Sequence, residues 1–153
     1  MKKSKGAFVL NDSIFLNSKK TTNQGMAILS EPIFKLALND ESKLIGEKIR
    51  ICIESYNDDK LTPHPTKDGF KTINDPLIKL AGEKSSKSFF TKVKDVEVVL
   101  IANVLYFTPT DNYGWKEGFK KTKHPNIELD HATATDEDLG KALLKAFELS
   151  SIV

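Results

Sequence analysis

Residues 96–109, VEVVLIANVLYFTP, are the segment that most restricts the fold of this chain. Two apolar runs rich in β-branched and aromatic residues stand on either side of Ala102 and Asn103. Runs of this kind with a two-residue separation predict an antiparallel β-hairpin with a tight turn. Because both arms are almost continuously apolar, we expect them to lie in the middle of a sheet that is covered on both faces.

The first third of the chain also favours short strands. Residues 6–10 and 13–16 are apolar, and a turn-prone Asn-Asp pair separates them. Residues 17–25, NSKKTTNQG, are polar and predict a loop. In the apolar run that follows, Pro32 argues against a continuous central strand, because proline cannot donate a hydrogen bond to a neighbouring strand.

Two longer segments have the spacing of amphipathic helices. The first can be capped by Asn39 or Asp40, and the polar residues 57–59 are expected to end it. The second follows Thr135, which is a good N-cap, and Asp138 stands where the reciprocal residue of a capping box belongs. We expect this last helix to cover the sheet.

Shorter elements fill the rest of the chain. Two prolines within residues 60–75 predict an irregular stretch. Pro76 is suited to open a short helix that Gly82 closes, and a second short helix is expected from Ser85 or Ser86. Residues 127–129 predict one more short strand.

Together these elements predict an α/β (α+β) fold with a largely antiparallel central sheet and helices packed on it. The length of 153 residues, of which 39% are hydrophobic and 29% charged, predicts that residues 1–153 form a single domain with its own core. The single cysteine, Cys52, falls on an apolar helical stripe, so we interpret it as a buried core residue rather than a nucleophile.

The N-terminus carries lysines, but only the four apolar residues 7–10 follow before polar residues resume. A secretory signal needs about 7–15 apolar residues, and a membrane span needs about 18. We therefore expect no membrane association. A lone cysteine also fits a reducing compartment, so the expected location is the cytoplasm.

Motifs that carry catalytic chemistry are missing from the sequence. The phosphate-binding patterns GxxxxGK[ST] and GxGxxG and the nucleophile elbow GxSxG do not occur. The histidines His64, His124 and His131 lack the spacing of a local metal site. We therefore predict no catalytic residues, no metal and no cofactor, and a protein that is not an enzyme.

The segment Pro109–Phe119, PTDNYGWKEGF, is the one constellation that favours a function. It contains the only tryptophan, Trp115, together with Tyr113, and both residue types are frequent anchors at protein interfaces. The competing interpretation is structural, with Trp115 and Phe119 tucked under the loop to fix it to the sheet. A stacking platform for single-stranded nucleic acid is a third interpretation, although few basic residues surround the aromatic ones.

Five segments, taken in order, resemble the contact-dependent growth inhibition immunity family of bacteria. The resemblance extends over about residues 13–151, and one departure is Ser86, where the family often has tryptophan. The segments are GMAILSEPIFKL (Gly25–Leu36), DPLIKLAGEKSSKSF (Asp75–Phe89), YFTPT (Tyr106–Thr110), EGF (Glu117–Phe119) and TDEDLGKALLKAFELS (Thr135–Ser150).

This resemblance implies a partner rather than a reaction. Proteins of the family bind a cognate toxin domain, which is the C-terminal region of a very large secreted surface protein delivered by neighbouring cells. The toxin is frequently a nuclease, and immunity is a stoichiometric, non-covalent block in the cytoplasm. The sequence does not indicate the oligomeric state or the identity of the toxin.

Charge complementarity then suggests where such a toxin would bind. A nuclease is expected to be basic around its substrate groove, so acidic and aromatic positions are the natural complement. One candidate cluster consists of Asp111, Tyr113, Trp115 and Glu117. The other consists of Asp58 and Asp59 beside the proline-rich stretch.

An alternative function remains open at this point. Residues 1–25 carry five lysines against one aspartate, although the whole chain has a net charge of only +2. A small nucleic-acid-binding protein could use this basic N-terminal arm together with the aromatic loop. Steep salt dependence of oligonucleotide binding would distinguish it from the immunity protein, for which no direct nucleic-acid contact is expected.

Overall fold

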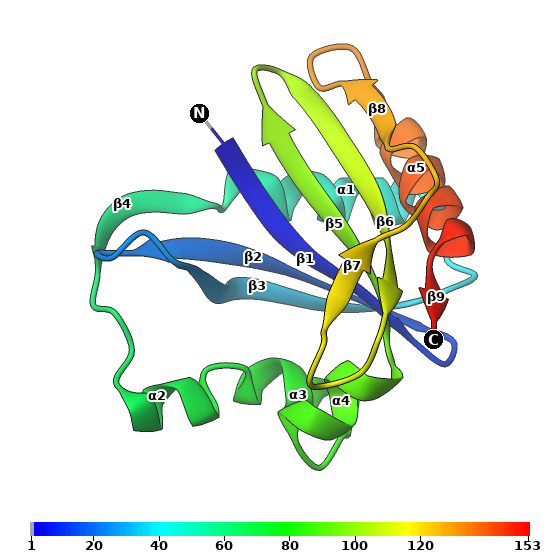
Figure 1. The fold of residues 1–153 in the computed structure, drawn as a ribbon. Coiled ribbons are helices and arrows are strands. Elements are labelled where there is room, and N and C mark those ends of the chain that lie inside the picture. The colour runs from blue at the N-terminus through cyan, green and yellow to red at the C-terminus, as the bar shows by residue number, and fades with distance from the viewer. Residues whose placement is uncertain (1) are drawn as a thin grey trace.

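The computed structural model describes residues 2–153 as a twisted sheet with helices on both of its faces (Figure 1). The strands are β1 (Lys2–Leu10), β2 (Ser13–Thr22), β3 (Ala27–Ala37), β4 (Asn57–Thr62), β5 (Lys94–Ile101), β6 (Val104–Asn112), β7 (Phe119–Lys121), β8 (Ile127–Asp130) and β9 (Ser151–Ile152). The helices are α1 (Ser42–Glu54), α2 (Lys67–Thr72), α3 (Asp75–Ala81), α4 (Ser86–Lys92) and α5 (Asp136–Leu149).

The sheet is largely antiparallel, as the sequence predicts. Its main path runs in the order β3-β2-β1-β5-β6-β7, and each neighbouring pair on this path is antiparallel. β8 adds to β6 in antiparallel orientation, whereas β4 pairs with β2 and β9 pairs with β6 in parallel. The predicted α/β class is therefore confirmed.

The predicted hairpin is β5–β6, which lies in the middle of the sheet. Its turn residues Ala102 and Asn103 both have positive φ, 49° and 69°, as a two-residue turn that matches the strand twist requires. The prediction that both faces of this hairpin are covered is wrong for part of it. Val98 and Phe107 are buried under α1 and α5, but Glu97, on the opposite face, is exposed.

The loop predicted for residues 17–25 is wrong for residues 17–22, because β2 continues to Thr22, and only residues 23–25 form a turn. Ser18 and Thr21 of this half of β2 are buried and find partners in the last turn of α1 and just after it. The Ser18 hydroxyl donates to the Cys52 carbonyl at 2.8 Å, and the Thr21 and Tyr56 hydroxyls are 2.7 Å apart. A buried polar side chain that is hydrogen-bonded carries little penalty, so this half of the strand needs no apolar residues.

The prediction of a basic N-terminal arm is also wrong. Three of its lysines belong to β1 and two to β2. β1 pairs with β2 along Gly6–Leu10 and with β5 from Lys2 onward. β3 passes through Pro32 as a continuous strand, contrary to expectation. This is possible because β3 lies at the edge of the sheet and its register against β2 shifts beside the proline.

Helices α1 and α5 pack against each other and against one face of the sheet (Figure 1). The predicted capping box of α5 is confirmed: Asp138 N–H donates to Thr135 Oγ1 at 3.1 Å, and Thr135 N–H donates to Asp138 Oδ2 at 3.0 Å. The predicted cap of α1 is wrong. Asp40 instead accepts a hydrogen bond from the Ala37 N–H, and the helix begins at Ser42.

The other face of the sheet is covered only in part. The connection between β4 and β5 forms α2, α3 and α4, so the stretch expected to be irregular contains a strand and a helix around its prolines. Gly82 ends α3 with a φ of 70°, as predicted. α4 begins at Ser86, one of the two predicted starts, and Ser85 is its N-cap. Phe89 and Leu77 bury the middle of this layer against Phe15 of β2. The remainder of the face stays open.

No helix among residues 2–153 is both long enough and apolar enough to cross a membrane.

Candidate interaction surface

The segment Tyr113–Gly118, which we call the aromatic loop, joins β6 to β7 and is fixed by Asn112. The Asn112 side-chain amide donates to the carbonyls of Phe90 and Val93, each at 2.8 Å, and its oxygen accepts from Gly114 N–H at 2.8 Å. Asn112 is 1% exposed. A buried amide with this many partners holds the loop against the connection between α4 and β5 in one conformation.

Trp115 lies on the rim of an aromatic cluster rather than under the loop. Its ring stacks on Phe90 with centroids 6.3 Å apart and an interplanar angle of 30°, yet the residue is 50% exposed. Phe119 is more enclosed and contacts Phe8 and Phe90. The structural interpretation therefore holds for Phe119, whereas Trp115 presents half of its surface to solvent.

The carboxylates of the aromatic region have local partners. Asp111 accepts a hydrogen bond from the Ser151 hydroxyl at 2.7 Å, which ties β6 to β9. Glu117 lies 3.7 Å from the Lys120 ammonium, and the same ammonium lies 4.8 Å from the centre of the Tyr113 ring. The exposed features of this cluster are therefore mainly aromatic, with their acidic charges locally compensated.

The second predicted cluster lies elsewhere. Asp58 and Asp59 are exposed on β4, which Figure 1 shows at the opposite end of the sheet from β7. Asp59 accepts a hydrogen bond from the Leu61 N–H at 2.9 Å, so it also shapes its own strand. The fold does not bring the two predicted clusters together.

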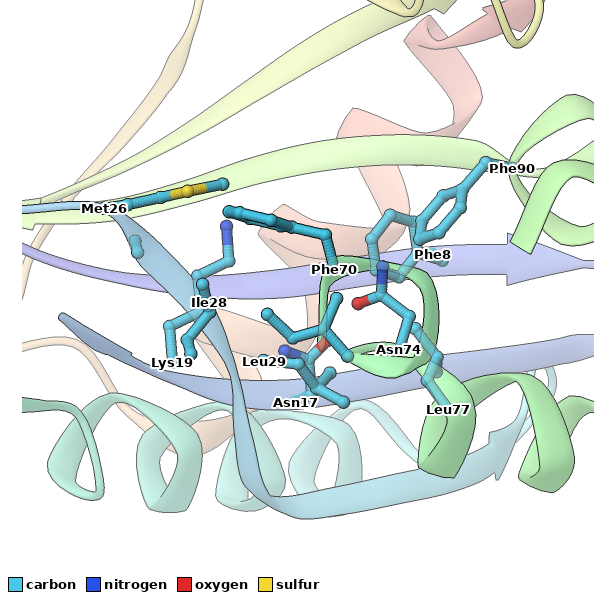
Figure 2. A pocket seen from close by; sticks show the side chains of 12 residues that line it. Phe8, Asn17, Lys19, Met26, Ile28, Leu29, Phe70, Asn74, Leu77 and Phe90 are labelled. Atoms are coloured by element: carbon cyan, nitrogen blue, oxygen red, sulfur yellow. The ribbon is translucent and has the colours of Figure 1, made fainter. Parts of the chain in front are cut away.

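An apolar hollow beside the aromatic loop was not foreseen. It has a volume of about 320 Å³ and opens between the sheet and the segment from α2 to α4 (Figure 2). Phe70, Met26 and Phe90 contribute to its lining, and Phe70 and Met26 are 38% and 44% exposed. The lining residues come from distant parts of the sequence, and the packing of α2, α3 and α4 against β1, β2 and β3 brings them together.

A second hollow, polar and about 480 Å³ in volume, lies next to the first on the same open face. Lys5 and Asp95 contribute to its lining, and both were overlooked in the sequence. Burial raises the pKa of the Asp95 carboxyl to about 7 and lowers the pKa of the Lys5 ammonium to about 8. The sequence contained one signal for them: Lys5 and Asp95 are charged residues within the otherwise apolar strands β1 and β5.

The remaining candidates for chemistry do not converge. His64 Nδ1 lies 3.1 Å from the Thr22 hydroxyl, and His131 lies after β8 at the other end of the chain. Within residues 2–153, no group of three histidine, cysteine or acidic residues has the geometry to hold a metal ion. Cys52 is buried, as predicted, and burial raises the pKa of its thiol.

Comparisons with known proteins agree with this architecture. A chain of the CdiA-CT/CdiI toxin and immunity complex from Yersinia pseudotuberculosis superimposes with a TM-score of 0.77, at 11% identity, over 98% of this chain and 98% of that one. A protein of unknown function from Neisseria meningitidis gives a TM-score of 0.74 at 12% identity, over 98% and 96% of the two chains. At these identities the likeness shows a shared fold.

No curated protein matches the sequence closely enough to be counted as a relative. The family model described as CDI immunity protein, in contrast, matches residues 34–150. That match covers most of the chain, from β3 through α5, and includes the aromatic loop. The chain therefore belongs to the CDI immunity protein family.

Proposed function

We propose that this protein binds and neutralises a cognate toxin domain, the C-terminal region of a large surface protein, by stoichiometric non-covalent inhibition in the cytoplasm. The observation that carries the proposal is the family match over residues 34–150. The shared fold with a chain from a toxin and immunity complex supports it.

The proposed contact surface consists of the aromatic loop and of Asp111, which precedes Asn112 in β6. Trp115 and Tyr113 are exposed, and Asn112 holds them in place before any partner arrives. A rigid aromatic anchor loses little conformational entropy on binding, which favours high affinity. Asp111 and Glu117 are proposed to set orientation at the edge of this surface.

Asp58 and Asp59 form a separate proposed contact at the far end of the sheet. Both are exposed, and exposed carboxylates can attract a basic toxin over long range. A nuclease toxin, which must bind phosphates, would carry the basic surface that these residues complement. The separation of the two clusters favours a large toxin surface over a single inserted loop.

A pull-down of the tagged protein from its native cell, eluted in denaturant and analysed by mass spectrometry, tests the proposal. We expect a near one-to-one amount of a C-terminal fragment of one very large surface protein, retained in high salt. Recovery of nucleic acid, or of no such fragment from cells shown to make the surface protein, would contradict the proposal. Salt-sensitive recovery of nucleic acid would support the nucleic-acid alternative.

A further inference from the structure

The apolar hollow lies between two walls that are connected through one hydroxyl group. Met26, next to the start of β3, belongs to one wall, and Phe70 of α2 belongs to the other (Figure 2). The hydroxyl oxygen of the fully buried Thr22 accepts hydrogen bonds from the backbone N–H groups of Gln24, at 3.3 Å, and Met26, at 3.2 Å. The same oxygen lies 3.1 Å from Nδ1 of His64. The hydroxyl therefore links the chain before β3 to the chain that leads into α2.

These three contacts determine the protonation state of His64. A hydroxyl group has one hydrogen to donate and two lone pairs with which to accept. Because the two backbone N–H groups occupy both lone pairs, the Thr22 hydroxyl donates its hydrogen to His64 Nδ1. Nδ1 then carries no hydrogen, and the imidazole is neutral with its hydrogen on Nε2. An imidazolium ion has a hydrogen on both nitrogens, so it cannot accept this bond.

The His64 ring also contacts α2. Its centroid lies 5.3 Å from that of the Phe70 ring, and the two rings are T-shaped with an interplanar angle of 70°. Pro63 and Pro65 restrict the backbone on both sides of His64. α2 is a helix of six residues without a buried side chain, and Figure 1 shows it at the end of an extended connection from β4. A helix this short has little stability of its own, so its position depends on such contacts.

No counter-ion is in place for a protonated His64. Within residues 2–153, no carboxylate lies within ion-pair distance of its ring nitrogens. The turn formed by residues 23–26 carries no charged side chain. The charged residues of the neighbouring elements are Lys19 and Lys20 of β2, Asp58, Asp59 and Lys60 of β4, and Lys67, Asp68 and Lys71 of α2. An imidazolium would therefore lose the bond to Thr22 without gaining an ion pair.

We propose that His64 is a pH-dependent latch, which holds α2 beside the apolar hollow while the imidazole is neutral and releases α2 when the imidazole is protonated. Histidine is the residue type whose charge changes between about pH 8 and pH 5. Acidification replaces the Nδ1 lone pair with an N–H that faces the Thr22 oxygen, whose acceptor sites are already occupied. The bond is lost, the ring leaves Phe70, and one wall of the hollow becomes mobile. The latch is a property of the free protein, so it and the proposed toxin binding can fail independently.

NMR of the full-length free protein tests both parts of the proposal. At about pH 7.5 the ring-nitrogen shifts of His64 are expected to place its hydrogen on Nε2. The backbone order parameters of α2 are expected to fall from about 0.85, typical of a rigid backbone, to below about 0.6 when the pH is lowered to about 5.5. Those of α5 should stay unchanged. A hydrogen on Nδ1 near neutral pH, or order parameters of α2 that do not change with pH, would overturn the proposal.

Substitutions separate His64 from the other groups that titrate. In His64→Asn the side-chain oxygen can still accept from the Thr22 hydroxyl but does not titrate, so the pH response of α2 should disappear. In Thr22→Val the hydroxyl is missing, so α2 should be mobile at both pH values. His131→Gln removes a histidine that follows β8, and this matched control should keep the full response. A response that persists in His64→Asn contradicts the proposal, and this variant keeps the test decisive if Thr22→Val does not fold.

Discussion

Gly46 of α1 lies against the backbone at the start of α5, and Gly140 of α5 lies against the backbone at the start of α1. A Cβ atom added at Gly46 would come within 1.6 Å of the Asp136 carbonyl oxygen, and one added at Gly140 within 1.9 Å of the Ser42 carbonyl oxygen. This reciprocal contact lets the two helices approach closely while both cover the sheet. Neither position has the positive φ that would require glycine. Glycine is needed at both because the two helices approach each other so closely.

Gly140→Ala is therefore expected to destabilise the fold by about 3 kcal/mol, because the obstacle is backbone that cannot rotate away. Urea unfolding followed by circular dichroism measures the change. The matched control is Gly69→Ala in α2, where the added Cβ meets its nearest neighbours at 3.4 Å. An unchanged unfolding midpoint for Gly140→Ala would contradict the packing described for α1 and α5.

Asn112→Ala removes the anchor of the aromatic loop. The two hydrogen bonds to Phe90 and Val93 leave buried carbonyls unsatisfied when the amide is lost. We expect a loss of about 2 kcal/mol in unfolding free energy and increased solvent exposure of Trp115, visible as a red shift of its fluorescence. Asn23→Ala, on an exposed turn, is the control. Unchanged fluorescence and stability would show that the loop is held by other contacts.

Trp115→Ala tests the proposed toxin contact. Truncation of a half-exposed interface tryptophan is expected to cost about 2 kcal/mol, or roughly 30-fold in Kd for the cognate toxin domain, with little loss of stability. Asp111→Ala should weaken binding less. Ile101→Ala at the far hairpin turn serves as the control in the same calorimetric titration. If Trp115→Ala and Asp111→Ala both bind as tightly as the control, the aromatic loop and the adjoining end of β6 are not the interface.

Asp95 should make stability depend on pH. Its pKa is raised from about 3.8 to about 7 by burial, so the folded protein binds a proton more tightly than the unfolded chain does. The stabilising contribution is complete below the unfolded pKa and is lost as the pH rises through 7. Unfolding free energies measured between pH 4 and 8 should therefore fall with pH. Asp95→Asn should flatten this trend, and a parallel pH profile for the variant would contradict it.

Sequence patterns predicted the parts of the fold that depend on interactions between residues close together in the chain. The β5–β6 turn, the capping box at Thr135 and the helix end at Gly82 each depend on residues a few positions apart. The polar half of β2 escaped prediction because Ser18 and Thr21 find their partners 34 and 35 residues further along the chain. No short-range pattern in residues 17–25 indicates these distant hydrogen bonds.

The exposure of the proposed contact surface was predictable to a similar extent. The composition of the aromatic loop identified Trp115 and Tyr113, and both are exposed. The pairing of Phe8 with Asp95 across β1 and β5 places the charged group on the open face, and a one-residue change of register would send it to the other face. Sequence alone did not set that register, so the polar hollow had no counterpart in the prediction.

The pairing of β9 with β6 has a practical consequence for protein engineering. Ser151 hydrogen-bonds Asp111, and Val153 N–H donates to the Asn112 carbonyl at 2.8 Å, so the chain leaves the sheet beside the aromatic loop. Figure 1 shows the N-terminus at the distant end of β1. A purification tag or fluorescent fusion attached after Val153 would emerge next to the proposed contact surface and shield it. The same fusion placed before β1 would leave the aromatic loop accessible, but it would emerge near the other proposed contact, because Lys2 and Asp58 line one hollow.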